Sequence, residues 1–222
     1  MIKLHNVTKT YQVSQDTQFT ALNNISFSIK QGEFVAITGP SGSGKSTLMH
    51  LIGLLDRPSS GEILVEGKNV ENLSDDQLSQ LRSEFVGFVF QQFNLISKMT
   101  VLENVMLPTI YARRALPFDP HERAIKLLGD VGLQDKMNSY PNKISGGQQQ
   151  RTAIIRAMMM APPLILADEP TGNLDSKSGR EILDILAQLN KKEKLTVILV
   201  THDPTVAARA KRIIRLRDGK LV

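Results

Sequence analysis

The fold is decided by a run of eight residues near the N-terminus, Gly39-Pro40-Ser41-Gly42-Ser43-Gly44-Lys45-Ser46. The run follows a short apolar segment, 34–38, whose composition is typical of a strand buried on both faces. A segment that we expect to be helical, 46–55, comes directly after it. Because the run fits G-x-x-x-x-G-K-[ST] between a strand and a helix, we interpret it as a phosphate-binding loop.

The chemistry of this loop follows from its residue types. Glycines let backbone amides curl around a phosphate group without side-chain clashes, and the helix that starts here directs its positive end at the anion. Lys45 can reach the outer phosphates of a nucleotide, and the Ser46 hydroxyl can bind Mg²⁺. Such a loop by itself is compatible with kinases, GTPases and many ATPases.

Two adjacent carboxylates follow a second apolar segment, 164–167. In a phosphate-transferring enzyme, a strand of this kind brings Asp168 to the Mg²⁺ ion. Glu169 is then placed to orient or deprotonate the attacking water. A charged pair at a strand end is often only solvated, but the upstream phosphate loop favours the catalytic interpretation.

The rest of the chain predicts an α/β fold. Further apolar runs of strand length are 86–90 and 196–200, and Ile213–Leu216 is predicted to be an edge strand. Helical patterns lie between most of them, which indicates a nucleotide-hydrolase core with a mostly parallel sheet. The first thirty residues predict an N-terminal antiparallel β subdomain, and Ser74–Gln77 has the spacing of a capping box.

We expect one domain over 1–222, with the α/β core formed by 1–92 and 161–222. The segment 93–160 has helical patterns and few strand signals, so it predicts an inserted helical subdomain.

Composition excludes several classes of function. The 222 residues include no Cys, which excludes disulfides and thiolate metal sites, and no Trp. No apolar run approaches the roughly 18 residues that a membrane-spanning helix needs, so a role at a membrane would require docking to a partner. The net charge of +5 is mild, aromatic residues make up 5%, and no basic run is long, so we expect no nucleic-acid partner.

The segment Ile144-Ser145-Gly146-Gly147-Gln148 resembles the signature motif of ATP-binding-cassette (ABC) proteins, and the match extends to Arg151. The family's commonest form begins with Leu, so Ile144 exchanges one apolar residue for another. Ser145 and two glycines in front of a helix also provide a second anion site made of backbone amides.

Other landmarks of that family occur in the expected order. Tyr11 stands where the family places an aromatic ring on adenine, and Gln91 resembles the glutamine that contacts Mg²⁺ and the attacking water. Asp175 resembles the aspartate that couples two active sites, and His202 the histidine that touches the γ-phosphate. The resemblance covers 3–219 and is strongest for the branch of lipoprotein-releasing and macrolide- or peptide-exporting ATPases.

The resemblance implies a head-to-tail dimer in which each ATP lies between Gly39–Thr47 of one copy and Ser145–Gln148 of the other. It implies ATP and Mg²⁺ as cofactors, catalytic roles for Lys45, Gln91, Glu169 and His202, and metal ligands Ser46, Gln91 and Asp168. It further implies a separate transmembrane permease subunit as partner and a peripheral location at the cytoplasmic face of the inner membrane. The nucleotide-binding set comprises Tyr11, Gly39, Pro40, Ser41, Gly42, Ser43, Gly44, Lys45, Ser46, Thr47, Ser145, Gly146, Gly147, Gln148 and Asp175.

Three alternatives share parts of this pattern. The ATPase head of a DNA-repair or chromosome-maintenance complex has the same motifs but generally carries a long coiled coil, and no sustained heptad appears between Phe90 and Ile144. A translation-linked cassette protein usually has two cassettes in one chain. A non-catalytic nucleotide-binding module would not need both Glu169 and His202.

Overall fold

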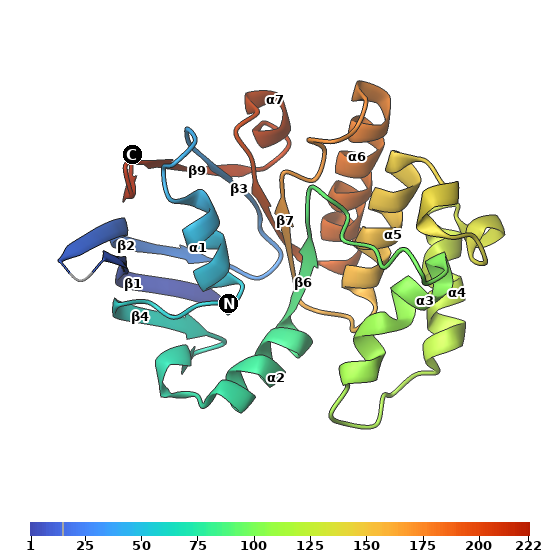
Figure 1. Ribbon diagram of the computed structural model, residues 1–222, viewed down its shortest axis with the longest axis horizontal. Coiled ribbons are helices and arrows are strands. Elements are labelled where there is room, and N and C mark those ends of the chain that lie inside the picture. The colour runs from blue at the N-terminus through green and yellow to red at the C-terminus, as the bar shows by residue number, and fades with distance from the viewer. Residues whose placement is uncertain (15) are drawn as a thin grey trace. The chain divides into compact units, whose positions relative to one another are not determined.

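The computed structural model describes residues 1–14 and 16–222 and divides into two units (Figure 1). The first unit consists of Met1–Arg82 and Thr196–Val222, and the second of Ser83–Leu195. In the order of the chain, the second unit is therefore an insertion into the first.

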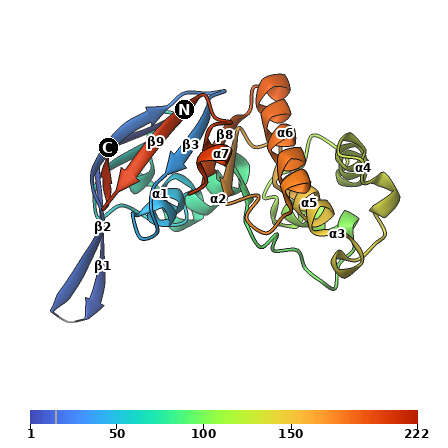
Figure 2. The same cartoon turned by 90° about the horizontal axis from the view of Figure 1, so that it is seen from above.

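An antiparallel sheet opens the first unit. Its strands lie in the order β2-β1-β4-β5 and comprise β1 (Ile2–Ser14), β2 (Thr17–Ile29), β4 (Ser60–Val65) and β5 (Lys68–Asn69). Figure 2 shows β1 and β2 side by side. Ile2 lies opposite Ile29 on one neighbour and Val65 on the other, and all three are buried, as the period of two predicts. This confirms the predicted N-terminal antiparallel β subdomain.

A parallel group of strands completes the first unit. β3 (Phe34–Thr38) runs parallel to β8 (Thr196–Val200) on one side and to β9 (Arg212–Arg217) on the other. Every residue of β8 is buried, in agreement with the apolar run that predicted it. The prediction that Ile213–Leu216 forms an edge strand was wrong. A turn with positive φ at Asp218 and Gly219 lets β10 (Lys220–Leu221) fold back and pair with β9.

The helices near the first unit's strands begin at recognisable signals. They are α1 (Lys45–Ile52), η1 (Val70–Asn72), α2 (Asp75–Phe85) and α7 (Pro204–Ala207). The predicted capping box is present at α2, where the Gln77 amide donates to Ser74 Oγ at 3.2 Å and the Ser74 amide to Gln77 Oε1 at 2.9 Å. Helix α1 ends earlier than predicted because Leu54, just after it, has a left-handed φ of 58°.

The second unit is built on two parallel strands, β6 (Val86–Val89) and β7 (Leu164–Asp168). Its helices are α3 (Val101–Met106), η2 (Leu107–Tyr111), α4 (Pro120–Asp130), η3 (Gln134–Lys136), η4 (Pro141–Lys143), α5 (Gly146–Met158) and α6 (Ser176–Glu193). Helix α5 contacts β6 directly. A Cβ atom on Gly87 would collide with the Ala157 carbonyl, so glycine is what permits this close approach.

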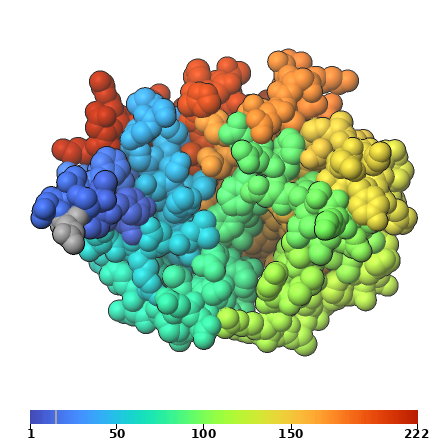
Figure 3. All heavy atoms as spheres, in the orientation of Figure 1, coloured from blue at the N-terminus to red at the C-terminus, as the bar shows by residue number. Residues whose placement is uncertain are grey.

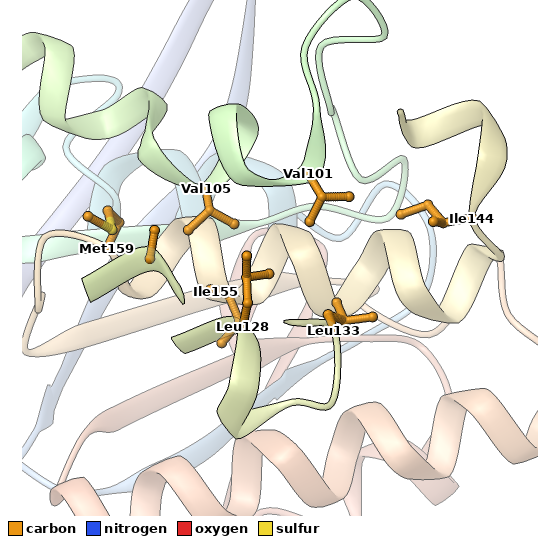
Figure 4. Close-up of a cluster of buried hydrophobic side chains, with 8 residues drawn as sticks. Val101, Val105, Leu128, Leu133, Ile144, Ile155 and Met159 are labelled. Atoms are coloured by element: carbon orange, nitrogen blue, oxygen red, sulfur yellow. The ribbon is translucent and has the colours of Figure 1, made fainter. Parts of the chain in front are cut away.

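Apolar side chains from α3, α4, α5 and the segments next to these helices form the core of the helical part (Figure 4). The eight buried members are Val101, Val105, Ala124, Leu128, Leu133, Ile144, Ile155 and Met159. Because Ile144 belongs to this cluster, the segment that precedes α5 is anchored in the core.

The predicted mixed α/β architecture with a helical insertion is confirmed. The predicted helical segment, 93–160, lies wholly within the second unit, together with β6, β7 and α6. The α-helices between Gln91 and Ile144 have only 6 and 11 residues, too short for the coiled coil of the alternative ATPase heads. Within 1–14 and 16–222, no helix has the length and apolarity needed to cross a membrane.

Candidate functional site

The glycine loop before α1 has the backbone conformation that its sequence predicts. Gly44 is the N-cap residue and adopts φ 99°, a left-handed value that residues with a Cβ rarely take. A Cβ atom on Gly44 would lie 2.6 Å from the Ala21 carbonyl oxygen, and one on Gly39 would collide with the Leu216 carbonyl. No side chain caps this helix, so the first backbone amides of α1 have the arrangement that suits an anion.

Lys45 is held at the mouth of this loop by backbone oxygens. Its Nζ atom donates to the carbonyls of Gly39 and Pro40, each at 2.8 Å. The ammonium group therefore lies over the loop, where it can exchange a carbonyl for a phosphate oxygen.

A pocket of about 260 Å³ opens beside the loop, lined by Phe19, Ala21, Ser41, Gly42, Gly44, Lys45, Ser46 and Thr47. Figure 3 shows the α1 segment (light blue) next to the N-terminal hairpin (dark blue), and α1 contacts β2. Phe19 supplies the apolar wall of this pocket and is 55% exposed. Sequence reasoning missed Phe19, which the structure places across the hairpin from Tyr11.

Tyr11, the predicted adenine-stacking residue, does not line the pocket itself. Its hydroxyl donates to Asp56 Oδ2 at 3.0 Å, while Lys9 lies over its ring and donates to Asp56 Oδ1 at 2.6 Å. Burial raises the pKa of the Tyr11 phenol, a hydrogen bond with Thr47 works against that rise, and Asp56 adds to it. The Tyr11 hydroxyl is therefore tied to the end of the phosphate loop and to Asp56.

His202 lies close to the start of the loop. It follows β8 and lines a second pocket of about 390 Å³, together with Thr38, Gly39, Pro40, Pro204, Ala207, Ile213 and Arg215. The next residue, Asp203, caps α7 through the Thr205 amide at 2.7 Å, and this bond lowers the pKa of the Asp203 carboxyl. The structure thus places His202 beside Gly39 and Pro40 at the start of the loop, and the capped helix fixes the turn that carries it; its contact with a γ-phosphate stays a prediction.

In the second unit, β7 ends in the predicted carboxylate pair. Asp168 is the last residue of the strand, and Glu169 adopts φ 42°, an uncommon left-handed value for a residue with a long side chain. The Gly172 amide donates to the Glu169 carbonyl at 3.0 Å and closes the turn. This local strain fixes the direction in which the Glu169 side chain leaves the backbone, a feature that collects at functional sites.

Gln91 is cross-linked to the loop that follows Glu169. Its Nε2 donates to Asn173 Oδ1 at 3.2 Å, and Asn173 Nδ2 returns a bond to the Gln91 carbonyl at 3.0 Å. A Cβ atom on Gly172 would lie 2.6 Å from Gln91 Nε2, so a side chain at this position would displace the Gln91 amide. Asn173 is a second residue that sequence reasoning left without a role.

The predicted signature segment starts α5 with a complete capping box. The Ser145 amide donates to Gln148 Oε1 at 2.8 Å, and the Gln148 amide donates to Ser145 Oγ at 3.3 Å. The amides of Gly146 and Gly147 remain as the other first-turn donors of the helix, as the second anion site requires.

Asp175 caps the next helix, α6. One of its oxygens accepts the amides of Lys177 and Ser178, each at 3.0 Å. The side chain and amide of Ser178 hold the pKa of the Asp175 carboxyl below its ordinary value. A Cβ atom on Gly147 would lie 3.0 Å from Ser178 Oγ, so the signature segment and the Asp175 cap are neighbours within this unit.

The predicted site residues therefore form two groups. The loop residues, Tyr11 and His202 belong to the first unit, whereas Gln91, Asp168, Glu169, the signature segment and Asp175 belong to the second. The predicted Mg²⁺ ligands come from both units, so this set stays a prediction.

Comparisons with known proteins give a consistent result. The family described as ABC transporter matches residues 22–172. Over its whole length the chain is 50% identical to the uncharacterised ABC transporter ATP-binding protein MJ0796 of Methanocaldococcus jannaschii, and it covers 95% of that protein. It is 51% identical over 219 residues to the macrolide export ATP-binding/permease protein MacB of Bdellovibrio bacteriovorus, of whose length it spans only 33%.

A solved structure is similar over the same extent. It is the dimeric post-hydrolysis state of the ATP-binding cassette MJ0796 bound to ADP and Pi, with a TM-score of 0.89, 49% identity, and coverage of 100% of this chain and 96% of that one.

Proposed function

Because the chain belongs to the ABC transporter family of ATP-binding proteins, we propose that it is the ATP-hydrolysing subunit of a complex that works at a membrane. The chain is an ATPase of this family. The observation that carries the proposal is that one chain has two helix N-termini suited to phosphate, α1 after the glycine loop and α5 after Ser145.

ATP binds first through the loop. The amides between Ser41 and Thr47 and the ammonium group of Lys45 surround its phosphates, and Lys45 gives up a backbone carbonyl for a phosphate oxygen. Phe19 supplies an apolar surface for the base, and Tyr11, braced by Asp56, lies across the hairpin from it.

The donor set proposed for Mg²⁺ has the chemistry that this ion requires. A hydroxyl from Ser46, an amide oxygen from Gln91 and a carboxylate from Asp168 are hard oxygen donors. Among residues 1–14 and 16–222, no three His, Cys, Asp or Glu side chains gather into a metal cluster, which agrees with an ion that takes most of its ligands from phosphate and water. Bound Mg²⁺ would neutralise charge on the phosphates.

Hydrolysis then depends on positioning and charge. Glu169 orients the attacking water and accepts its proton, and Gln91 holds the same water. His202 contacts the γ-phosphate from beside the loop, a placement favoured by its pocket with Gly39 and Pro40. Phosphoryl transfer needs little covalent chemistry from the protein, so the directions of these side chains set the rate.

The second copy of the chain completes each site. A dimer agrees with the dimeric relative, and we place the Ser145–Gln148 segment of one copy on the γ-phosphate held by the loop of the other. ATP then forms part of the dimer interface, so binding closes the dimer and hydrolysis opens it.

The proposed membrane-spanning partner is a permease. MacB relatives are named as ATP-binding/permease proteins, and the chain spans about a third of their length. We propose that the chain lies peripherally at the cytoplasmic face of the membrane and drives export, lipoprotein release or mechanical transmission.

Co-purification tests this proposal. The tagged Glu169→Gln variant is expressed in its native host. ATP and Mg²⁺ are then added, the membranes are mildly solubilised, and the proteins bound to the variant are identified. We expect a multi-spanning membrane protein in stoichiometric amount, and much less of it with Lys45→Ala as the matched variant that binds ATP poorly. Recovery only from the soluble fraction, with nucleic acid or a coiled-coil protein, would overturn the transport role and leave the ATPase chemistry intact.

A further inference from the structure

Gln150 is a completely buried amide in the first half of α5. Its side chain is 0% exposed, and its Nε2 atom donates to the Pro170 carbonyl at 2.7 Å and to the Phe90 carbonyl at 3.3 Å. All three residues belong to the second unit. One amide group therefore ties α5 to two segments that lie 60 and 20 residues away in the chain.

The two carbonyls stand next to the residues proposed to act on the attacking water. Phe90 directly precedes Gln91, and Pro170 directly follows Glu169. Two carbonyl acceptors require two N–H donors on one neutral group, which is what a Gln amide provides. A carboxylate of the same length would repel both.

The oxygen of the Gln150 side chain, Oε1, indicates that packing alone does not explain why an amide is buried at this position. Within the described ranges, 1–14 and 16–222, Gln150 Oε1 is a buried acceptor without a hydrogen-bond partner. Burying an acceptor in this way is unfavourable, and an apolar side chain of similar volume would avoid it. The amide is therefore better explained by the two carbonyls that it holds.

Further bonds attach the same helix to the same segment. The Arg156 guanidinium donates to the carbonyls of Phe93 and Asn94, and burial lowers the pKa of Arg156. Phe93 and Asn94 have φ values of 58° and 52°, so the segment after Gln91 is held in an uncommon conformation. Helix α5 starts at Ser145, so the signature segment, Gln91 and the neighbourhood of Glu169 are connected through one rigid element.

We propose that Gln150 is a positioning residue for ATP hydrolysis, which couples a displacement of the signature helix to the placement of Gln91 and Glu169. The inference rests on the proposed ATPase role of Glu169. Because Gln150 is completely buried and bonded to two backbone carbonyls, it acts through those two backbone segments.

The test compares Gln150→Leu with Gln149→Leu. Leu has a similar volume to Gln and removes both donors. Gln149 is a half-buried neighbour on the same helix whose side chain donates to the Ile144 carbonyl. For Gln150→Leu we expect kcat to fall about tenfold to a hundredfold, since small misplacements of reacting groups have effects of this size. The Kd for ATP should stay within about threefold. Tm should change little, because the removal of the unpaired acceptor Gln150 Oε1 offsets the loss of the donor to the Phe90 and Pro170 carbonyls. Gln149→Leu should leave kcat within about twofold.

A double-variant cycle separates positioning from structure. If Gln150 acts through Glu169, adding Gln150→Leu to Glu169→Gln should reduce the residual rate much less than it reduces the wild-type rate. Should Gln150→Leu fail to fold, Gln150→Met replaces it, since Met adapts to irregular core sites. A kcat within twofold of wild type, or a loss of kcat matched by losses of ATP affinity and Tm, would overturn the inference. A wild-type chain without ATPase activity would instead refute the proposed function.

Discussion

The phosphate loop and the segments around Glu169 are held in place in different ways. In the loop, glycine conformations and contacts between near neighbours fix the geometry, as when Lys45 bonds to carbonyls five and six residues away. Around Glu169, side chains reach across the chain, as when Gln91 and Asn173 bond over 82 residues. The first region is therefore set by local sequence, and the second by how the helices of its unit are placed.

This difference suggests that the loop determines ATP binding and that the segments around Glu169 determine hydrolysis. The loop and the segments that pack against it all belong to the first unit, so its phosphate binding should depend little on the second unit. Glu169, which we propose activates the water, has neighbours that are bonded to α5, so its position should respond when that helix moves. ATP binding to the loop of a single copy should thus be less sensitive than hydrolysis to changes in the second unit.

The largest effect should come from Glu169→Gln. The amide keeps the size of the side chain but cannot accept the proton of the attacking water, so we expect kcat to fall by about 10²–10⁴-fold with ATP affinity nearly unchanged. Steady-state hydrolysis and equilibrium ATP binding measure the two effects. Glu181→Gln on the exposed face of α6 is the matched control. Near-normal hydrolysis by Glu169→Gln would contradict the proposal that Glu169 activates the attacking water.

Lys45→Ala should act on binding instead. Losing a charged hydrogen-bond donor to phosphate costs about 1.5–3 kcal/mol, which corresponds to an affinity loss of roughly 10–100-fold. Titration with a fluorescent ATP analogue gives the affinity, and Lys3→Ala, an exposed lysine of the same unit, should bind normally. Unaltered affinity in Lys45→Ala would contradict the interpretation of the loop.

A smaller effect is expected at the base-binding wall. Base–aromatic stacking contributes about 1–3 kcal/mol, so Phe19→Ala should weaken ATP binding about tenfold. Tyr11→Phe keeps the ring and removes only the hydroxyl that donates to Asp56, so the affinity of this variant for ATP should change little. Val13→Ala on the same hairpin serves as control, since Val13 is exposed and does not line the pocket. Normal binding by Phe19→Ala with a full loss in Tyr11→Ala would assign the base to Tyr11 alone.

The smallest effect concerns the ion pair behind Tyr11. Burial works to raise the pKa of Asp56, but hydrogen bonds from Lys9, the Arg57 amide and Tyr11 outweigh it, so the folded-state pKa lies below the unfolded value. A lowered pKa means that the stabilisation is complete above the unfolded value, about 3.9, and is lost as pH falls through the folded value.

We therefore expect Asp56→Asn to lower the free energy of unfolding by up to about 1 kcal/mol at pH 7, and by progressively less below about pH 4. Urea unfolding at several pH values measures this difference. A difference that does not shrink on acidification would show that the Asp56 carboxylate contributes nothing through its charge.

The same comparison explains what could be predicted from sequence. The phosphate loop, the strand before it and the Ser145 cap each consist of consecutive residues. Residue pattern and spacing were therefore enough to predict them. The carboxylate pair at the end of β7 was also correctly placed at a strand end, because a buried strand has a clear apolar run.

Other features depend on register and distance. The β1–β2 pairing shifts register several times, so no simple count along the hairpin places Phe19 opposite Tyr11. The bonds of Gln150, Arg156 and Asn173 join segments that are far apart in the chain, and side-chain identity alone does not name a partner. The two-residue strand β10 is too short to give a periodic signal, which is why β9 was mistaken for an edge.

Mixing two inactive variants tests the central claim, that each ATP is held by the loop of one copy and the signature segment of the other. Lys45→Ala damages the loop. Gly146→Asp damages the signature segment by adding a negative charge; a Cβ atom there has room, with its nearest neighbour, a side-chain atom of Leu174, at 3.4 Å, and an acidic residue in the first turn suits a helix. In a head-to-tail dimer, one of the two sites of a mixed pair is intact.

ATP hydrolysis by the equimolar mixture is the measurement. Random pairing makes about half of the dimers mixed, so the account predicts recovery of up to about a quarter of wild-type activity from two variants that are each inactive alone. A mixture that remains as inactive as its components, under conditions where wild type dimerises with ATP, would contradict the shared site.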